Sequence, residues 1–264
     1  MLTFYPIGAL VAPFISSSII GSGLSWRFSY YVIIFIIAVN MALYIFIIGR
    51  RKGTSANLKD ERLSFKEIFT DRKKNFILVL IFFAIIFYCS SETVISTWAP
   101  TFFRLERGLD IQSAGFLITL FWILIVIGRL ISLFLAGKVE SIRIMAILSM
   151  LAIVSISALI FIKTVYIIYI LVVIAGLGYS ALFPLLVSTG STIYEKGRGV
   201  LATILFVASN IGVSSAPFIT RYISAKNMLF SVGIAPVIMA GVFILMIVLM
   251  LIWPRKVPGP DAFH

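Results

Sequence analysis

The sequence has 264 residues, of which 61% are hydrophobic and only 12% are charged, and its mean hydropathy is +1.13. Soluble domains are about 45–50% apolar and about 25% charged, so this composition excludes a soluble globular protein. Cys89 is the only cysteine and the terminal His264 the only histidine, which excludes disulfide frameworks, the usual zinc sites and Ser-His-Asp chemistry; we therefore expect no enzyme activity, no metal and no cofactor.

Eight long apolar runs follow one another along the chain. A bilayer core of about 30 Å needs roughly 20 apolar residues of helix to cross it, and each run is long enough to do so. Two of the runs contain one ionisable residue each, Glu92 and Arg129. The sequence therefore predicts an all-α polytopic membrane protein with eight spans, at residues 1–26, 28–49, 75–98, 111–137, 144–162, 164–194, 199–220 and 227–254.

A short motif occurs in both the first and the seventh predicted spans. "IGALVAPFIS" covers residues 7–16 and "IGVSSAPFIT" covers residues 211–220, and because the second copy lies six spans after the first, both run in the same direction through the membrane. A parallel repeat of six helices is typical of transporters built from two six-helix halves, although chance similarity between apolar helices is the alternative. Its small and helix-bending residues favour helix packing, and they are Gly8, Pro13, Gly212 and Pro217.

If the repeat is genuine, residues 1–49 are the last two helices of an N-terminal bundle. Residues 75–254 then form a six-helix C-terminal bundle, and four helices would have to be supplied upstream or by a separate chain. Between the bundles we expect a linker, residues 50–74, in which Ser64 and Glu67 have capping-box spacing before a short amphipathic helix. A disordered basic linker is the alternative.

The net charge of +12 would suit nucleic-acid binding or a membrane topology. Fifteen of the 22 basic residues lie on the side of the predicted linker and only six on the other side, with Arg129 within a span. Because cytoplasmic loops of membrane proteins carry the excess of Lys and Arg, the linker and the tail at residues 255–264 are predicted to be cytoplasmic. The charge is thus a topology signal, and no nucleic-acid partner is expected.

Several motifs resemble the major facilitator superfamily of secondary transporters. "PIGALVAPFISSSIIGSG", followed by Trp26 and Arg27, is similar to helix five of that family, and the basic linker falls between its two halves. The segments "SETVISTWAPTFF", "FWILIVIGRL" and "GLGYSALFPLLVSTG" resemble helices seven, eight and ten of the fucose-permease-like sugar branch. The resemblance implies helices five to twelve of a twelve-helix bundle; the signature loop between helices two and three is not in this sequence.

Glu92 is the first candidate functional residue. If Trp98 marks the outer interface, a rise of about 1.5 Å per residue puts Glu92 about 9 Å inside the membrane. A carboxylate at that depth costs at least about 2.5 kcal/mol on insertion scales, so it should face a cavity or the protein interior. Burial disfavours the charged form, which suits a group that exchanges a proton or holds a polar solute. A carboxyl group that only bridges helices is the alternative.

Arg129 and five neutral residues are weaker candidates. Arg129 lies about 13 Å of helix before Lys138, so it either snorkels and caps helix carbonyls or, as the resemblance implies, forms a gating contact near the cytoplasmic mouth. These depths place it away from Glu92, and no direct ion pair is expected. Amides and aromatic rings in the spans either contact solute or pack between helices, and these residues are Asn40, Tyr88, Trp122, Tyr179 and Asn210.

We therefore predict a secondary active transporter of the cell membrane, coupled to protons as a symporter, for a small polar organic solute such as a sugar. Two bundles would alternate around a central site. The expected partners are the solute, protons, the lipid bilayer and a chain that supplies the missing helices. The alternatives are an inactive truncated fragment and a membrane component without transport activity, such as a receptor or an assembly subunit.

Overall fold

The computed structural model describes residues 15, 19, 22–25, 27–50, 71–135, 140–194, 197–224 and 228–253. The chain divides into two compact units with their boundary between Arg62 and Leu63, and each unit is described by itself. Most of the first predicted span, the motif residues Gly8 and Pro13, residues 63–70 of the predicted amphipathic segment 63–74 and the tail at 255–264 lie outside the described residues.

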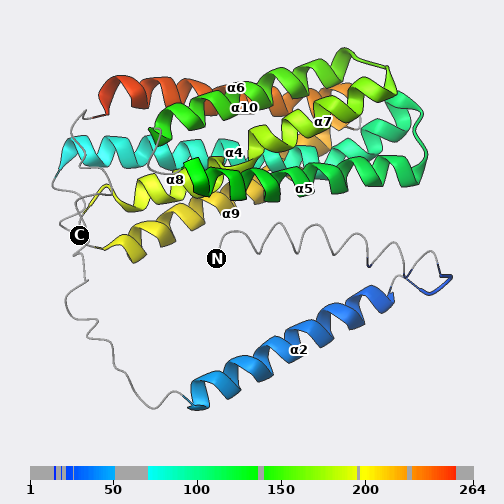
Figure 1. Ribbon diagram of the computed structural model, residues 1–264, viewed down its shortest axis with the longest axis horizontal. Coiled ribbons are helices and arrows are strands. Elements are labelled where there is room, and N and C mark those ends of the chain that lie inside the picture. Colours follow the sequence, from blue (N-terminus) through cyan, green and yellow to red (C-terminus); the bar gives the residue numbers. More distant parts are fainter. Residues whose placement is uncertain are drawn as a thin grey trace. The chain divides into compact units, whose positions relative to one another are not determined.

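The described residues form helices throughout (Figure 1). In the first unit, α2 covers Arg27–Arg50, and its apolar side chains are exposed from Phe28 to Phe46. The described part of the second unit contains seven helices. They are α4 (Arg72–Arg107), α5 (Ile111–Leu135), α6 (Ser141–Phe161), α7 (Val165–Ser180), α8 (Leu182–Ser191), α9 (Arg198–Ser224) and α10 (Met228–Ile252).

The number of spans differs from the prediction. Seven candidate spans are found among the described residues, where eight were expected along the whole chain. The span that is not among them is residues 1–26, which lies mostly outside the described part. The other seven match the predicted runs in order, and α7 and α8 together form one of them, Val165–Ser191.

The helix α4 is longer than the predicted span at 75–98. It begins at its N-cap Asp71, whose Oδ1 accepts hydrogen bonds from the amides of Lys73 (3.0 Å) and Lys74 (3.1 Å). It ends at Gly108, whose φ of 66° is the left-handed conformation that favours glycine. Pro100 lies within the helix and does not end it, because surrounding groups in a membrane bundle accommodate the lost backbone bond.

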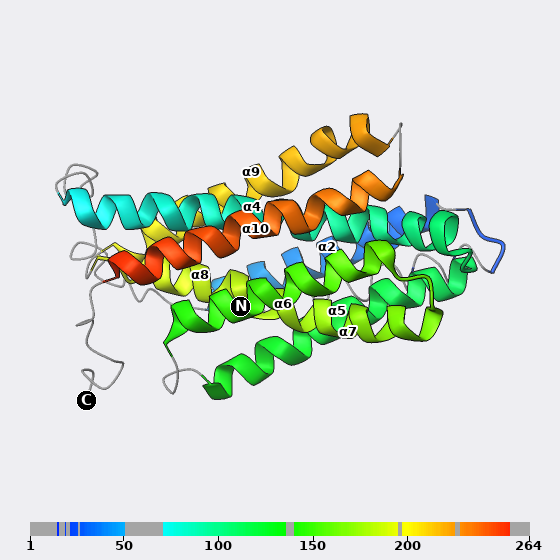
Figure 2. The same cartoon turned by 90° about the horizontal axis from the view of Figure 1, so that it is seen from above.

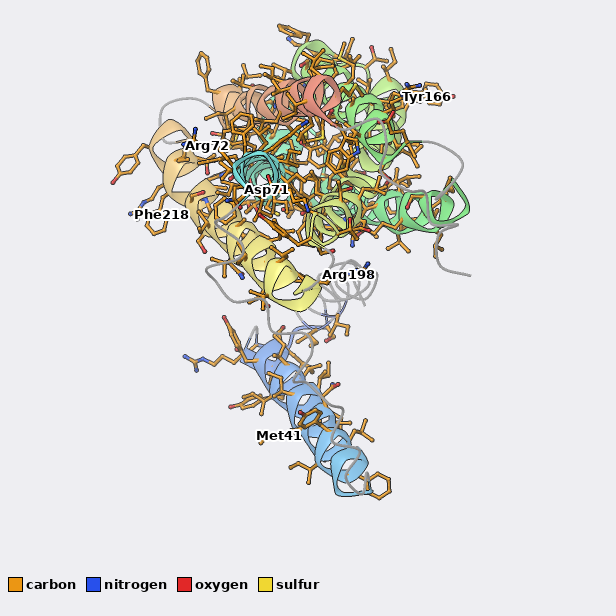
Figure 3. All side chains as sticks on the ribbon, turned by 90° about the vertical axis from the view of Figure 1, so that its left-hand side faces the viewer. Met41, Asp71, Arg72, Tyr166, Arg198 and Phe218 are labelled. Carbon is orange, nitrogen blue, oxygen red and sulfur yellow. The ribbon has the colours of Figure 1, made fainter. Side chains whose placement is uncertain are left out.

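Two contact patterns organise the bundle. The helix α4 packs between α9 and α10, and α7 packs between α5 and α6 (Figures 1 and 2). Large apolar side chains point outward over much of the surface, as Tyr166 and Phe218 do in Figure 3. Such a surface is suited to contact with the hydrocarbon core of a bilayer. The core of the bundle contains close helix contacts and a few polar groups.

Glycines let the central helices approach closely. A Cβ atom at Gly212 of α9 would lie 2.5 Å from the carbonyl oxygen of Ile86 and 3.0 Å from Cβ of Cys89, both on α4. A Cβ atom at Gly178 of α7 would lie 2.7 Å from the backbone nitrogen of Ala152 on α6. Small residues at such crossings allow the backbones to meet, so α4–α9 and α6–α7 are backbone contacts as well as side-chain contacts.

Polar side chains also tie helix ends to neighbouring helices. Arg107 Nη2 donates to the carbonyls of Leu159 (3.1 Å) and Ile160 (2.7 Å) near the end of α6, which have no partner within their own helix. Trp98 Nε1 donates to Thr220 Oγ1 at 2.7 Å and joins α4 to α9. Outside the spans, a hydrogen bond from the Ser113 side chain holds the pKa of the Asp110 carboxyl below its usual value.

Replacing Gly212 by Ala is expected to destabilise the bundle. The new methyl group would overlap the backbone of α4, and overpacking of this kind costs about 1–3 kcal/mol. The matched control is Gly115→Ala in α5, where a Cβ atom has no neighbour within 4 Å, so helix propensity predicts an unchanged or slightly higher stability. Thermal unfolding in detergent compares the two variants, and equal midpoints for both would contradict the close contact.

Candidate functional site

The carboxyl group of Glu92 is buried in the interior of the bundle. Only 8% of the residue is exposed, and Tyr88, one helical turn earlier on α4, is fully buried. The Tyr88 hydroxyl lies 2.8 Å from Glu92 Oε1 and 2.9 Å from the carbonyl oxygen of Tyr179 on α7. Residues at i and i+4 share a helix face, so the chain places the carboxyl group and its hydrogen-bond partner side by side.

The α7–α8 span is interrupted next to this carboxyl group. The helix α7 ends at Ser180, Ala181 forms a turn, and α8 begins at Leu182. Pro184 has no N–H and therefore cannot make the helical bond to the carbonyl of Ser180. The interruption leaves carbonyl oxygens at the end of α7 that need donors from outside the helix.

Arg129 supplies one of those donors. Its Nε atom donates to the carbonyl of Ser180 at 3.0 Å, and only 5% of the residue is exposed. A cation is favoured at the C-terminal end of a helix, where the helix dipole is negative. A Cβ atom at the preceding Gly128 would overlap the Ser180 side chain, so this glycine lets α5 come close enough for the bond.

Tyr88, the hydrogen-bond partner of Glu92, and Arg129 thus reach neighbouring carbonyls, those of Tyr179 and Ser180. The expected depths of Glu92 and Arg129 in the membrane stay a prediction, but the two side chains are closer to each other than those depths suggested. Trp98, taken as the marker of the outer interface, is not the end of α4, which continues to Arg107. Both charges converge on the α7–α8 interruption, with Tyr88 and the α7 backbone between them.

A second set of hydrogen bonds brings α10 into the same cluster. Ser91 Oγ donates to the carbonyl of Ala235 at 2.8 Å and lies 2.5 Å from the hydroxyl of Tyr179. Because the Ser91 hydroxyl donates its only proton to the Ala235 carbonyl, the Tyr179 hydroxyl is the donor in its hydrogen bond with Ser91. The Tyr179 ring packs against Tyr88 (centroids 5.9 Å apart) and Phe121 (5.5 Å). We name Tyr88, Ser91, Glu92, Arg129 and Tyr179 the polar cluster.

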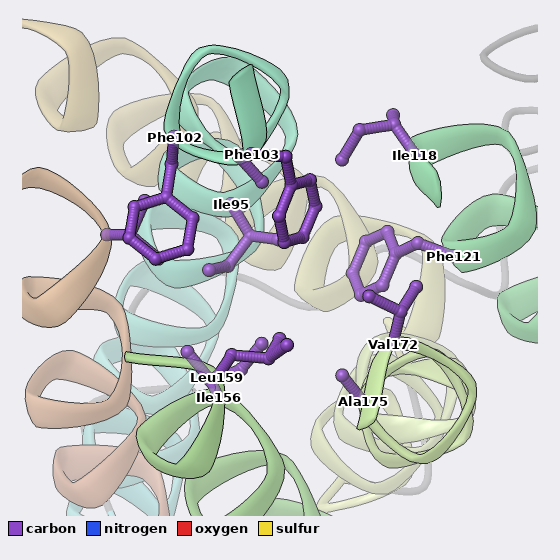
Figure 4. A pocket seen from close by; sticks show the side chains of 11 residues that line it. Ile95, Phe102, Phe103, Ile118, Phe121, Ile156, Leu159, Val172 and Ala175 are labelled. Atoms are coloured by element: carbon purple, nitrogen blue, oxygen red, sulfur yellow. The ribbon is translucent and has the colours of Figure 1, made fainter. Parts of the chain in front are cut away.

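An apolar space lies beside the polar cluster. Its volume of about 10 Å³ is close to the minimum for one water molecule, and every residue that lines it is apolar. Figure 4 shows Phe102, Phe103 and Phe121 around this space, with Ile95 of α4 and Val172 of α7. Because the lining offers a water molecule no hydrogen-bond partner, the cluster is dry on this side.

The structure also describes the other candidate residues, Trp122 and Asn210 in the second unit and Asn40 in the first. Trp122 is buried, with its ring centroid 5.9 Å from that of Phe121. Asn40 and Asn210 are exposed, and each amide donates to a carbonyl of its own helix, that of Ile36 (2.9 Å) and that of Phe206 (3.0 Å). Within the second unit, Asn210 is therefore not part of the cluster.

Gly212 and Pro217 lie within α9. Gly212 contacts α4 as described above, and its carbonyl accepts a hydrogen bond of 3.1 Å from Ser90 Oγ. Pro217 lies within the last two turns of α9 and does not end the helix.

Sequence reasoning missed two members of the site. Ser91 precedes Glu92 directly, and its position between α7 and α10 depends on the rotation of α4, which the sequence does not reveal. The sequence did contain a signal for the free carbonyl of Ser180. Pro184 lies four residues later and has no N–H, so it cannot supply the helical hydrogen bond to that carbonyl. In the described part of the chain, no group of three His, Cys, Asp or Glu residues could hold a metal ion.

Tyr88→Phe is expected to destabilise the bundle by about 1–3 kcal/mol, because the hydroxyl has one proton for two buried acceptors, Glu92 and the Tyr179 carbonyl, and its removal leaves one of them without a donor. The ring packing is retained. Tyr166→Phe is the matched control, since Tyr166 is 76% exposed and its hydroxyl faces outward. The measurement is thermal unfolding in detergent; an unfolding midpoint for Tyr88→Phe equal to that of the control would contradict the described network.

Comparison with known proteins gives one family match and several structural matches. The model of a family described as Major Facilitator Superfamily matches residues 1–217. No curated protein sequence matches the chain.

Two of the similar structures are crystal structures of a mutant of the peptide transporter POT. One, in complex with alafosfalin, has a TM-score of 0.61 and 21% identity, and the match covers 66% of this chain and 38% of that chain. The other, in complex with sulfate, has a TM-score of 0.60 and 20% identity, and the match covers 65% of this chain and 37% of that chain. The chain therefore spans less than two fifths of the length of these structures, and at this identity the likeness concerns the fold alone.

Proposed function

The chain belongs to the Major Facilitator Superfamily, and from this premise we propose that it acts as a proton-coupled secondary transporter, or as part of one, for a small polar organic solute. The family consists of transporters and not of enzymes. The carrier would work by alternating access between two helical bundles. The observation that carries the proposal is Glu92, an ionisable carboxyl group in the dry interior of a membrane bundle.

The polar cluster supports a role of Glu92 in proton exchange. A carboxyl group in a low-dielectric environment favours its neutral form, and contact with water or a cation favours the charged form. Glu92 shares the Tyr88 hydroxyl with the end of α7. A movement at the α7–α8 interruption would therefore change the hydrogen bonding of Glu92 directly, which couples protonation to helix position.

Arg129 has the gating role in this proposal. Its bond to the Ser180 carbonyl joins α5 to the same interruption, so opening of the span on that side requires that bond to break or to move with α7. We also propose contacts to the solute from aromatic rings and amides. The aromatic residues are Tyr88, Trp122 and Tyr179, and the amides that would bind the solute between the two bundles are Asn40 and Asn210.

For the solute we propose a sugar, on the strength of the three segments that resemble the fucose-permease-like branch. The POT structures provide a second solute class to test, because one of them holds alafosfalin. We also propose that residues 50–74 and 255–264 face the cytoplasm of the cell membrane, that residues 75–254 form one six-helix bundle, and that residues 1–49 pair with four further helices.

The deciding experiment uses the protein in proteoliposomes that contain a pH-sensitive dye. Sugars and small peptides are added outside in turn, and solute-induced acidification of the lumen is recorded. Acidification with one solute class supports proton-coupled transport and selects the solute. Binding of a solute without flux would favour a receptor or assembly component, and neither binding nor flux, with or without co-expressed helices, would favour an inactive fragment.

A further inference from the structure

A groove runs along the outer face of the bundle between α6 and α10. Its volume is about 410 Å³, within the range of small-molecule sites. The side chains that line it are all apolar, and they are Ala146, Ile147, Met150, Leu151, Val154 and Phe243. The groove shares no residue with the polar cluster.

The shape of the groove has a local cause on α6. Ala146 is small and 5% exposed, so it forms a floor, while Ile147 (65% exposed) and Met150 (47%) project outward. Both helices are long and apolar enough to cross a bilayer. What fills such a groove in a membrane must itself be apolar along its length.

A basic side chain stands at one end of this stripe. Arg143 precedes Ala146 by one helical turn, and residues 143, 147, 150 and 154 follow the spacing of one helix face. The Arg143 side chain is 70% exposed, and its one acidic neighbour in the described part is Glu140, with Nε 2.9 Å from Oε2. An exposed ion pair of this kind is weak, so the guanidinium can take a second anion at modest cost.

The length of the stripe matches one leaflet of a bilayer. Val154 lies eleven residues after Arg143, which is a rise of about 16 Å along the helix, and half of a bilayer core of about 30 Å is about 15 Å. From these observations we infer that the α6–α10 groove binds an anionic phospholipid, with one acyl chain in the groove and the phosphate at Arg143. Basic sites at the ends of membrane helices are suited to anionic headgroups.

Native mass spectrometry of the purified chain tests this inference. The protein is equilibrated with equal amounts of phosphatidylglycerol and phosphatidylcholine that carry identical acyl chains, and the lipid adducts are counted. We expect a several-fold excess of phosphatidylglycerol. Arg143→Gln should remove that excess and leave the total acyl-chain binding largely unchanged, whereas Arg198→Gln, a basic residue at the start of α9, is the control that should keep it.

Two variants test the groove itself. Ala146→Leu raises its floor, and Val154→Trp fills its far end at a position that is 54% exposed, where folding should not be affected. Both should lower the adducts of both lipids, while Val237→Trp, which adds the same bulk at an exposed position of α10 outside the groove, should not. Equal retention of the two lipids by the wild type, or unchanged adducts in Val154→Trp, would overturn the inference, as would a lipid-free dimer of the chain. None of these readouts depends on transport.

Discussion

Glu92→Gln is expected to abolish uphill, proton-driven accumulation of the solute and to leave membrane insertion and folding intact. Glutamine keeps the oxygen that accepts the hydrogen bond from Tyr88, so the link from α4 to α7 survives. It cannot exchange a proton, so the coupling is lost. The measurement is uptake into proteoliposomes with an imposed pH gradient, compared with downhill exchange of the same solute without a gradient.

The two assays separate coupling from binding. If exchange is retained and accumulation is lost, Glu92 has a role in proton coupling. If both are lost, Glu92 has a role in solute binding. Glu106→Gln is the matched control, because Glu106 lies on the same helix α4 near its end, one residue before the Arg107 that bonds to α6. It should keep both activities. Accumulation at the wild-type rate in Glu92→Gln would refute the coupling role.

Arg129→Leu is expected to be strongly destabilising, and Pro184→Ala is expected to restore part of the loss. Removal of the guanidinium leaves the buried carbonyl of Ser180 without the donor at 3.0 Å, and an unsatisfied buried group costs about 1–3 kcal/mol. Alanine at 184 returns a backbone N–H at the position that bonds to that carbonyl in a regular helix. The rescue is partial, because other interactions of Arg129 are not replaced.

A double-mutant cycle measures this compensation. The stabilities of the wild type, the two single variants and the double variant are compared by thermal unfolding in detergent. Coupled residues show interaction energies of about 0.5–3 kcal/mol, and here the double variant should be more stable than the sum of the single changes predicts. Pro236→Ala with Arg129→Leu is the control, since Pro236 lies within the continuous helix α10 and not beside the α7–α8 interruption. Additive effects of Arg129→Leu and Pro184→Ala would contradict the proposed origin of the contact.

The sequence predicted the spans far better than the contacts between them. Charge-free runs correctly gave the order of seven spans, because crossing a bilayer depends on length and hydropathy alone. The contacts depend on the rotation of each helix, and helices that are apolar on all sides carry no polar face to reveal it. Glu92 was recognised because a carboxyl group stands out in such a run; its neighbour Ser91 was not.

The prolines also show that the sequence does not reveal contacts between helices. Pro100 and Pro217 lie within continuous helices, whereas Pro184 follows a real interruption at Ala181. The three prolines look alike in sequence, since each removes one N–H. The difference comes from the surrounding bundle, where Tyr88 and Arg129 bond to the carbonyls at the interruption. Tertiary donors of this kind can be found only once the helices are placed.

The position of Cys89 has a practical consequence for spectroscopy. The thiol is buried in the contact between α4 and α9, beside Gly212, and it is the only one in the sequence. A cysteine introduced at an exposed position, such as Ser188 on α8 or Val154 on α6, would therefore be the thiol that a maleimide or nitroxide reagent reaches first. Distances between such labels could follow the movement of α8 against the rest of the bundle without replacement of Cys89.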